Sequence, residues 1–144
     1  MNKPETITSR DNGKLVNARK VRDGKIRSQV FIEGRRLAAE ALRSDIVIDE
    51  CLISDEFNHG ELIGAVRERT KNVSVVADRL FKTIADTNEP QGIILLAKRP
   101  EAMTVYPAYQ RTKVPVVLFL NEISNPSNLG AILRIAEAAG VVGM

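Results

Sequence analysis

Cysteine, histidine and tryptophan are almost absent from this sequence, and their scarcity excludes several kinds of protein. Cys51 is the only cysteine, His59 is the only histidine, and there is no tryptophan. A single cysteine cannot form a disulfide within one chain, and one cysteine with one distant histidine is not a metal-ligand cluster. We therefore expect no disulfide framework and no metal site, with Cys51 packed as a small buried residue and His59 at the surface.

Long apolar runs are missing as well. No stretch approaches the roughly 20 apolar residues that cross a bilayer, and no secretory-signal pattern opens the sequence. We expect a cytoplasmic protein with no membrane partner. The 144 residues, of which 44% are hydrophobic, are enough to bury a core.

Charge is unevenly distributed along the chain. Residues 1–36 contain ten Lys or Arg and four Asp or Glu, a net charge of +6, whereas residues 37–144 contain eleven and fourteen, a net charge of −3. The asymmetry indicates a polyanionic partner for the first quarter of the chain, although a basic segment can also be only a solvated, solubilising face. The candidate contacts are Arg10, Lys14, Arg19, Lys20, Arg22, Lys25, Arg27 and Arg35.

Hydrophobic periodicity predicts alternating strands and helices after a loose terminus at residues 1–7. The predicted strands are 29–33, 46–54, 72–77 and 91–97. Four helices are predicted. The first follows one of several candidate caps at residues 9–12 and runs through Val21, and the second begins after Gly34 and ends at Ser44. The third spans 61–69, and the fourth runs through Ile84 with Asp78 as its cap. This alternation is typical of a three-layer α/β/α domain.

Residues 98–113 contain Pro100 and Pro107 and no clear periodicity, which predicts a linker. We divide the chain into a domain at 1–99, a linker at 100–113 and a second domain at 114–144. Tyr106 and Tyr109 in this linker either pack against the domains they join or stack on nucleic-acid bases.

The stretch after the linker is an apolar run, a polar loop and an amphipathic helix. Val116 to Leu120 contains no polar residue, which favours a central strand covered on both faces. Pro126 suits a helix start and Gly140 a helix end. The apolar stripe of the helix is Leu129, Ile132, Leu133 and Ala136.

Arg134 projects nearly opposite the centre of that stripe, given about 100° of rotation per residue, so core packing does not explain it. A surface arginine paired with Glu137 at i+3 is one interpretation. A role in a functional site is the other.

Residues 125–134, NPSNLGAILR, followed by Glu137 and Gly140, resemble the first motif of SpoU-type RNA 2′-O-ribose methyltransferases of the SPOUT superfamily. The resemblance implies catalytic roles for Asn128 and Arg134, and for Glu137 through its acidic position. It also implies S-adenosylmethionine as the cofactor.

The first domain is similar to the substrate-binding domain that precedes the SpoU catalytic domain, whose fold is like that of small ribosomal RNA-binding proteins. Phe31-x-Glu33-Gly34 and Pro90-Gln91-Gly92-Ile93 carry this similarity, and it adds Gln91 to the candidate RNA contacts. Gly13 departs from the pattern, because many relatives have proline there. The implied partner is RNA, with ribosomal RNA first and transfer RNA second.

Taken together, we expect a ribosomal-protein-like α/β/α RNA-binding domain followed by an incomplete SPOUT (knotted) methyltransferase domain. Family members continue for roughly another hundred residues, a length near one further domain. The resemblance places the cofactor pocket and homodimer interface of the intact parent beyond Met144, so we expect the 144-residue chain itself to be inactive. The alternatives are a non-catalytic RNA-binding module of the ribosomal-protein type and a small α/β domain with a merely solubilising basic face.

Overall fold

The computed structural model describes residues 6–101 and 113–143 of the chain. The chain forms two compact units, Met1–Pro100 and Glu101–Met144. Most of the predicted linker, with Tyr106 and Tyr109, lies outside the described residues. Each unit is therefore described by itself.

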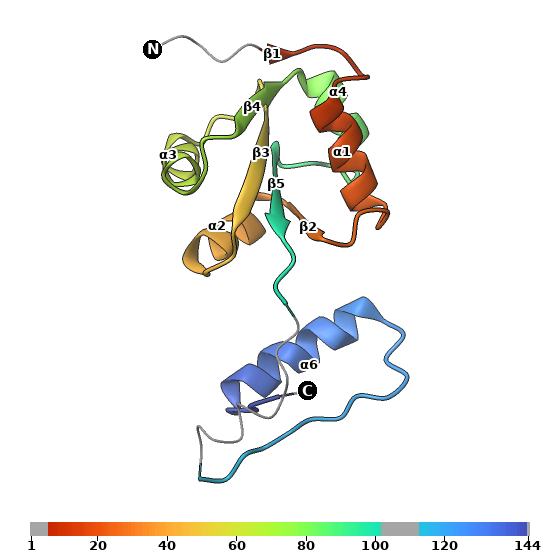
Figure 1. Cartoon of the computed structure of the whole chain (residues 1–144), viewed down its shortest axis with the longest axis vertical. Coiled ribbons are helices and arrows are strands. Elements are labelled where there is room, and N and C mark those ends of the chain that lie inside the picture. The colour runs from red at the N-terminus through yellow and green to blue at the C-terminus, as the bar shows by residue number, and fades with distance from the viewer. Residues whose placement is uncertain (1–5, 102–112, 144) are drawn as a thin grey trace. The chain divides into compact units, whose positions relative to one another are not determined.

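The first unit is built on a five-stranded sheet in the order β1-β4-β3-β5-β2 (Figure 1). Its strands are β1 (Thr6–Ile7), β2 (Gln29–Glu33), β3 (Ile48–Ser54), β4 (Val73–Val76) and β5 (Ile93–Lys98). β1, β4 and β3 run parallel, while β5 runs antiparallel to both of its neighbours, β3 and β2. Because β2 and β3 both oppose β5, four strands point the same way and only β5 points back.

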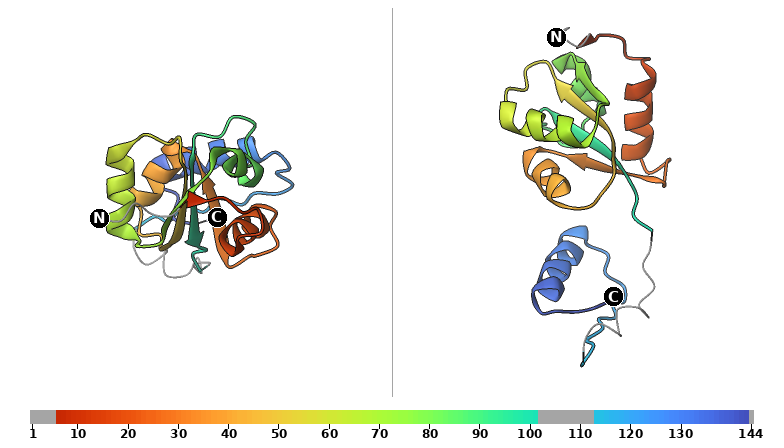
Figure 2. Two further views of the ribbon diagram at one scale, coloured as in Figure 1. Left: turned by 90° about the horizontal axis from the view of Figure 1, so that it is seen from above. Right: turned by 60° about the vertical axis from the view of Figure 1, so that its left-hand side comes forward.

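Four helices cover the two faces of this sheet, as Figures 1 and 2 show. They are α1 (Gly13–Arg22), α2 (Arg35–Arg43), α3 (Gly60–Arg69) and α4 (Asp78–Ile84). On one face α1 and α4 pack Leu15 and Phe81 against Leu52, and on the other α2 and α3 pack Ala38 and Val66 against other residues of β3 and β5. The predicted three-layer α/β/α architecture is confirmed.

β3 and β5 supply both cores because their side chains alternate between the two faces. Leu52, Ile94 and Leu96 face α1 and α4. Cys51 and Leu95 face α2 and α3 and are fully buried, which confirms the interpretation of Cys51 as a core residue. Strands apolar on both faces need cover on both faces, and the helices provide it.

The expectation of a loose terminus through Ile7 is wrong at its last two residues. Thr6 and Ile7 form β1, in parallel register with Val75 and Val76 at the end of β4. A two-residue strand is too short for any periodic pattern, and backbone pairing with a distant partner specifies it. Residues 1–5 lie outside the described part.

Helix starts follow the capping residues only in part. Of the several candidate caps at residues 9–12, Asn12 caps α1, its side chain accepting a hydrogen bond from the Lys14 N–H. Asp78 is the first residue of α4 rather than its cap, since Ala77 holds the cap position. The Asp78 N–H instead donates to Asp55 Oδ1 at 2.9 Å, so a neighbouring loop satisfies this helix end.

The second unit contains α6 (Pro126–Ala138), which begins and ends where the sequence predicts. Pro126 occupies the first turn, Asn125 accepts a hydrogen bond from the Ser127 N–H, and Gly140 follows the helix with φ of 74°. Of the predicted apolar stripe only Ala136 is buried within the described residues.

The predicted central strand at residues 116–120 is wrong for this unit. Val117 makes a single parallel bridge to Gly143, and Phe119 is 89% exposed. A strand needs neighbours for its backbone groups and cover for its apolar faces. Residues 113–143 contain one helix and one bridge. These provide too few strand neighbours and too little apolar cover for a strand at residues 116–120.

Candidate functional site

β2, β3 and β4 point the same way, so the loops that follow them lie at the same edge of the sheet. β5 points the opposite way and therefore starts at this edge. Backbone hydrogen bonds connect these loops, from the Gly34 N–H to the Ile93 carbonyl and from the Ser54 N–H to the Gly92 carbonyl. In open α/β sheets ligands bind outside the carboxyl ends of the parallel strands. The candidate site is therefore this carboxyl edge, which comprises residues 33–37, 54–60, 77–79 and 85–92.

Gln91 and Arg35, both predicted RNA contacts, lie together at the carboxyl edge. Gln91 Oε1 accepts a hydrogen bond of 2.8 Å from the Arg35 N–H, the first helical N–H of α2. Gly34 makes this contact possible. Its φ is 96°, and a Cβ there would lie 3.3 Å from Gln91 Oε1, so a larger residue would be strained and would crowd the amide.

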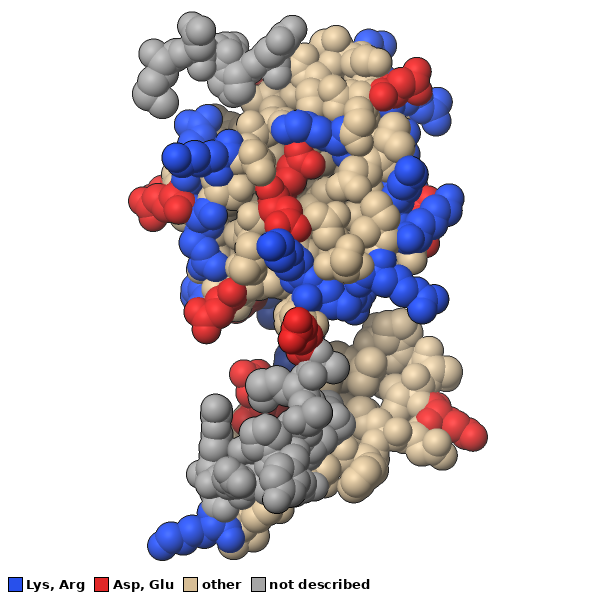
Figure 3. Space-filling model, in the orientation of Figure 1, with Lys and Arg blue, Asp and Glu red and all other residues tan. Residues whose placement is uncertain are grey.

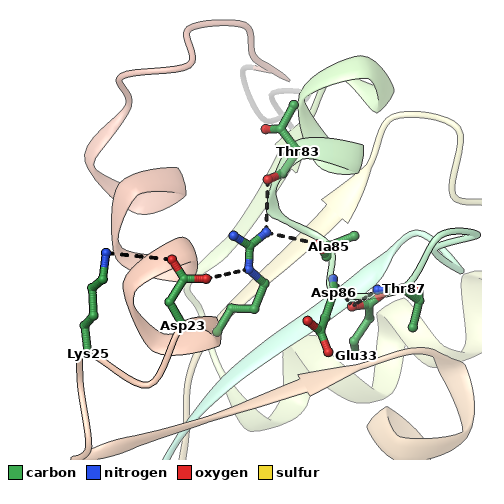
Figure 4. Close-up of polar contacts among 8 residues, drawn as sticks. Asp23, Lys25, Glu33, Thr83, Ala85, Asp86 and Thr87 are labelled. Carbon is green, nitrogen blue, oxygen red and sulfur yellow. Dashed lines mark hydrogen bonds and ion pairs between the residues drawn. The ribbon is translucent and has the colours of Figure 1, made fainter.

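Glu33 holds the loop at residues 85–91 against the end of β2. Its carboxylate accepts hydrogen bonds from the Asp86 N–H at 2.7 Å and from the hydroxyl of Thr87 (Figure 4). A cavity of about 190 Å³ lies between this loop and α2, with Thr87, Gln91 and Arg36 in its wall. The loop is thus fixed by side chains from outside itself, which preorganises one wall of the site.

Arg22, a predicted RNA contact, is bonded within the fold. Its Nη1 donates to the carbonyls of Thr83 and Ala85 at 3.2 and 3.1 Å, and its Nε pairs with Asp23 at 2.9 Å (Figure 4). These bonds join the end of α1 to the end of α4. The guanidinium is therefore committed to positioning the start of the loop at 85–91.

Lys14 is also engaged inside the domain. Its Nζ lies 2.9 Å from a carboxylate oxygen of Glu50 and donates to Ser74 Oγ at 2.7 Å. Arg19 donates to the carbonyl of Arg10 at 2.6 Å and so ties α1 to the loop after β1. The Arg10 side chain is exposed.

Lys20, Lys25 and Arg27 are exposed around the end of α1, with Lys25 Nζ 3.9 Å from Asp23 Oδ2. Arg99 joins this group, because its Nε donates to the Arg27 carbonyl at 2.7 Å. Figure 3 shows basic side chains along both flanks of the first unit, with acidic side chains between them. The predicted contacts are thus spread over the carboxyl edge, the end of α1, the loop after β1 and the start of α1 at Lys14, and do not form one stripe.

The three predicted catalytic residues lie on α6. Asn128, Arg134 and Glu137 are all exposed, and Arg134 and Glu137 form no ion pair within the described residues. The i+3 pair that one interpretation of the sequence expected is thus not formed among the described residues, and the role of Arg134 stays a prediction.

Two residues that sequence reasoning missed are Phe57 and Asn58, which lie on the carboxyl edge between β3 and α3. His59, expected at the surface, is half-buried beside them. The turn-like Asn58-His59-Gly60 was visible in the sequence, but its proximity to Gln91 depends on strand order, which the sequence does not display.

Comparison with known proteins identifies the first unit. The family described as MRM3-like substrate binding domain matches residues 13–95. The chain belongs to this family. Within it, the MRM3-like chain is 32% identical over 128 residues to "rRNA methyltransferase 3, mitochondrial" of Xenopus tropicalis, covering 88% of this chain and 30% of that protein.

A bacterial relative covers more of the MRM3-like chain. The "23S rRNA (guanosine(2553)-2'-O)-methyltransferase RlmP" of Bacillus subtilis is 28% identical over 138 residues, which are 94% of this chain and 51% of that protein. The chain thus spans about half the length of this relative and less than a third of the frog relative. The resemblance to SpoU-type RNA methyltransferases is confirmed.

Solved structures share the fold. An RNA 2'-O ribose methyltransferase superposes with a TM-score of 0.64 at 27% identity, covering 95% of this chain and 53% of the other. An AdoMet-bound rRNA methyltransferase from Sinorhizobium meliloti superposes with a TM-score of 0.69 at 22% identity, covering 95% of this chain and 52% of the other. The architecture described above is therefore the one found in these enzymes.

Proposed function

We propose that the MRM3-like chain belongs to an S-adenosylmethionine-dependent methyltransferase that modifies a ribose 2′-hydroxyl of RNA. In this proposal residues 1–99 bind the RNA, 100–113 link the domains, and 114–144 supply the first catalytic motif. The observation that carries it is the family match over residues 13–95, a substrate-binding domain by description. Relatives named for rRNA support ribosomal RNA as the first substrate, and one named for both RNAs supports transfer RNA as the second.

The proposed role of Arg134 follows from the chemistry of its side chain. Methyl transfer requires a hydroxyl that is held in line and helped to lose its proton. The guanidinium is a poor proton acceptor because its pKa exceeds ~12, but its planar fork suits a phosphate or a developing alkoxide. We propose that Arg134 positions and polarises the target nucleotide, with Asn128 hydrogen-bonding near the same site. Glu137 joins the proposed site only through its acidic position in the motif.

S-adenosylmethionine, when bound, supplies the electrophilic methyl group. Residues 113–143 do not fit this cofactor by themselves. One helix and a single bridge from Val117 to Gly143 enclose no space for it, and Phe119 points into solvent. We therefore assign no cofactor ligand among them, and the proposed activity is that of the whole protein, as a homodimer.

The test of the catalytic proposal is the Arg134→Lys variant of the whole protein. We expect turnover on ribosomal RNA to fall about a hundredfold, because lysine cannot give the bidentate contact, with little change in RNA affinity. Transfer of a labelled methyl group and filter binding measure the two quantities. Arg67→Lys, on exposed surface of α3, is the control. Unchanged turnover in Arg134→Lys would remove this residue from the mechanism.

RNA binding by the 144-residue chain separates the remaining alternatives. Affinity for ribosomal RNA fragments should fall steeply with salt, since each phosphate contact releases counterions. Salt-dependent binding without methylation by the whole protein supports the non-catalytic RNA-binding module. Absence of binding supports a solubilising basic face. Light scattering of the whole protein tests the proposed homodimer.

A further inference from the structure

A second cavity, of about 270 Å³, opens at the carboxyl edge on the other side of Gln91. It lies between the loop after β3 and the turn before β5, and Phe57, Asn58 and His59 line it. Its volume is slightly below the usual range for drug-sized ligands, about 300–1,000 Å³, which leaves room for one small flat group. The RNA contacts predicted from the sequence include Arg35 and Gln91 on its rim but assign nothing to its interior.

Gly92 places an aromatic ring in the wall of this cavity. The φ of Gly92 is 78°, and a Cβ at this position would lie 3.0 Å from Cδ2 of Phe57. Only glycine therefore lets the Phe57 ring approach the turn so closely. Phe57 in turn stacks with His59, with ring centroids 6.3 Å apart and an interplanar angle of 16°. The result is a pair of nearly parallel rings beside an open space.

His59 is a poor choice for the helix that it precedes. It holds the cap position of α3, where Ser, Thr, Asp or Asn would stabilise the first turn, and its side chain makes no capping hydrogen bond. A residue type that weakens a helix end is expected at a functional position rather than at a purely structural one. The imidazole instead stacks on Phe57.

The polar groups of the cavity suit a base better than a phosphate. The Asn58 amide provides donors and an acceptor, and the Gln91 amide provides N–H donors, since its oxygen already accepts from the Arg35 N–H. The Glu56 carboxylate repels a phosphate but accepts hydrogen bonds from base amino groups. The exposed Arg35 provides a positive charge at the rim, where a phosphate would follow the base.

We propose that this cavity binds a single unpaired RNA base, stacked on the Phe57–His59 pair and hydrogen-bonded by Asn58. The inference rests on the proposed RNA-binding function and deepens it, since it assigns single-stranded loops or bulges as the RNA class that the domain distinguishes from duplex. Stacking on aromatic side chains is how proteins recognise unpaired bases.

The experiment compares two RNAs of equal length, a hairpin with 2-aminopurine in its loop and a fully paired duplex, bound to the 144-residue chain. We expect the hairpin to bind more tightly and its 2-aminopurine fluorescence to be quenched. His59→Ala and Asn58→Ala should each lower hairpin affinity about tenfold and leave duplex affinity unchanged. Neither residue belongs to the buried core, so the variants should fold, which circular dichroism checks.

Two control variants distinguish binding of the base from contact with the RNA phosphates. Lys25→Ala, at an exposed basic residue, should lower both affinities, and Glu68→Gln, on the outer surface of α3, should lower neither. Equal binding of hairpin and duplex by the unaltered chain would overturn the base pocket and leave RNA binding in place. Binding to neither RNA would overturn the RNA-binding proposal itself, and the base pocket with it.

Discussion

Cys51 shows how burial controls the chemistry of one side chain. The residue is fully buried in β3, and burial, together with the neighbouring Glu50 carboxylate, raises the pKa of its thiol to about 12. The reactive thiolate is therefore scarce at neutral pH. We predict that an aromatic disulfide reagent leaves native Cys51 unmodified at pH 8 and modifies it at once in denaturant. Rapid modification of the native protein would show that β3 opens readily.

Glu33 is the residue that we expect to matter most for the loop at 85–91. Glu33→Gln replaces a carboxylate that accepts bonds from Asp86 and Thr87 with a neutral amide. We predict that the free energy of unfolding falls by about 1 kcal/mol, because bonds to a charged group are stronger than neutral ones. Urea titration measures the change. Glu68→Gln, at an exposed site, is the control. Equal stability of both variants would show that the Glu33 carboxylate does not stabilise the loop at 85–91.

Individual residues also show what the sequence could predict of the site. Gln91 and Arg35 were both predicted as RNA contacts, and the structure places them side by side through the Arg35 N–H, while their contact with RNA stays a prediction. Lys14 and Arg22 were grouped with the other basic residues, because sequence gives the sign of a charge but not its partner. Glu50 and the carbonyls of α4 become their partners only when strands and helices pack.

At the scale of elements, α4 carries a charge arrangement that depends on pH. Its first residue, Asp78, accepts a hydrogen bond from Lys82 one turn later and another from the Ser54 hydroxyl. The bond from Lys82 lowers the pKa of Asp78 below its usual 3.8, and the same contact raises the pKa of Lys82. A carboxylate at a helix N-terminus is also favoured by the helix dipole.

The sign of the pH effect follows from the lowered pKa. The unfolded chain takes up the proton of Asp78 at a higher pH than the folded chain does, so the stabilisation is present above the usual value of 3.8 and is lost as pH falls toward the folded pKa. We predict that Asp78→Asn is less stable than the unaltered chain at pH 6, and that the gap narrows below pH 4. Thermal melts across pH measure it. Asp45→Asn, at an exposed aspartate, should show no such gap.

Elements with a strong local pattern were predictable, and those that depend on distant partners were not. The helices α1 to α4 and α6, and the strands β2 to β5, match apolar periodicity and turn residues. β1 has two residues and exists because β4 pairs with it. Residues 116–120 have the composition of a strand, but within 113–143 they form a single bridge, between Val117 and Gly143.

At the scale of the whole molecule, the two buried cores found within residues 6–101 and 113–143 both belong to the first unit. Every residue of both clusters lies between Leu15 and Leu96. We predict that a chain ending at Pro100 folds by itself and unfolds in one cooperative transition, at the same urea concentration as the main transition of the 144-residue chain. Circular dichroism follows both. A fragment with helical signal but no sigmoidal transition would show that the second unit completes the fold.

The order of the strands has a consequence for synthesis on the ribosome. β5, which is made last in the domain, lies between β3 and β2, so β2 has no partner strand and cannot join β3 in the sheet until residues 93–98 leave the exit tunnel. Until then the parts of α1 and α2 that pack on β5 stay uncovered. Nascent chains of this protein should therefore need protection by chaperones through almost the whole translation of the first unit, and should become protease-resistant abruptly.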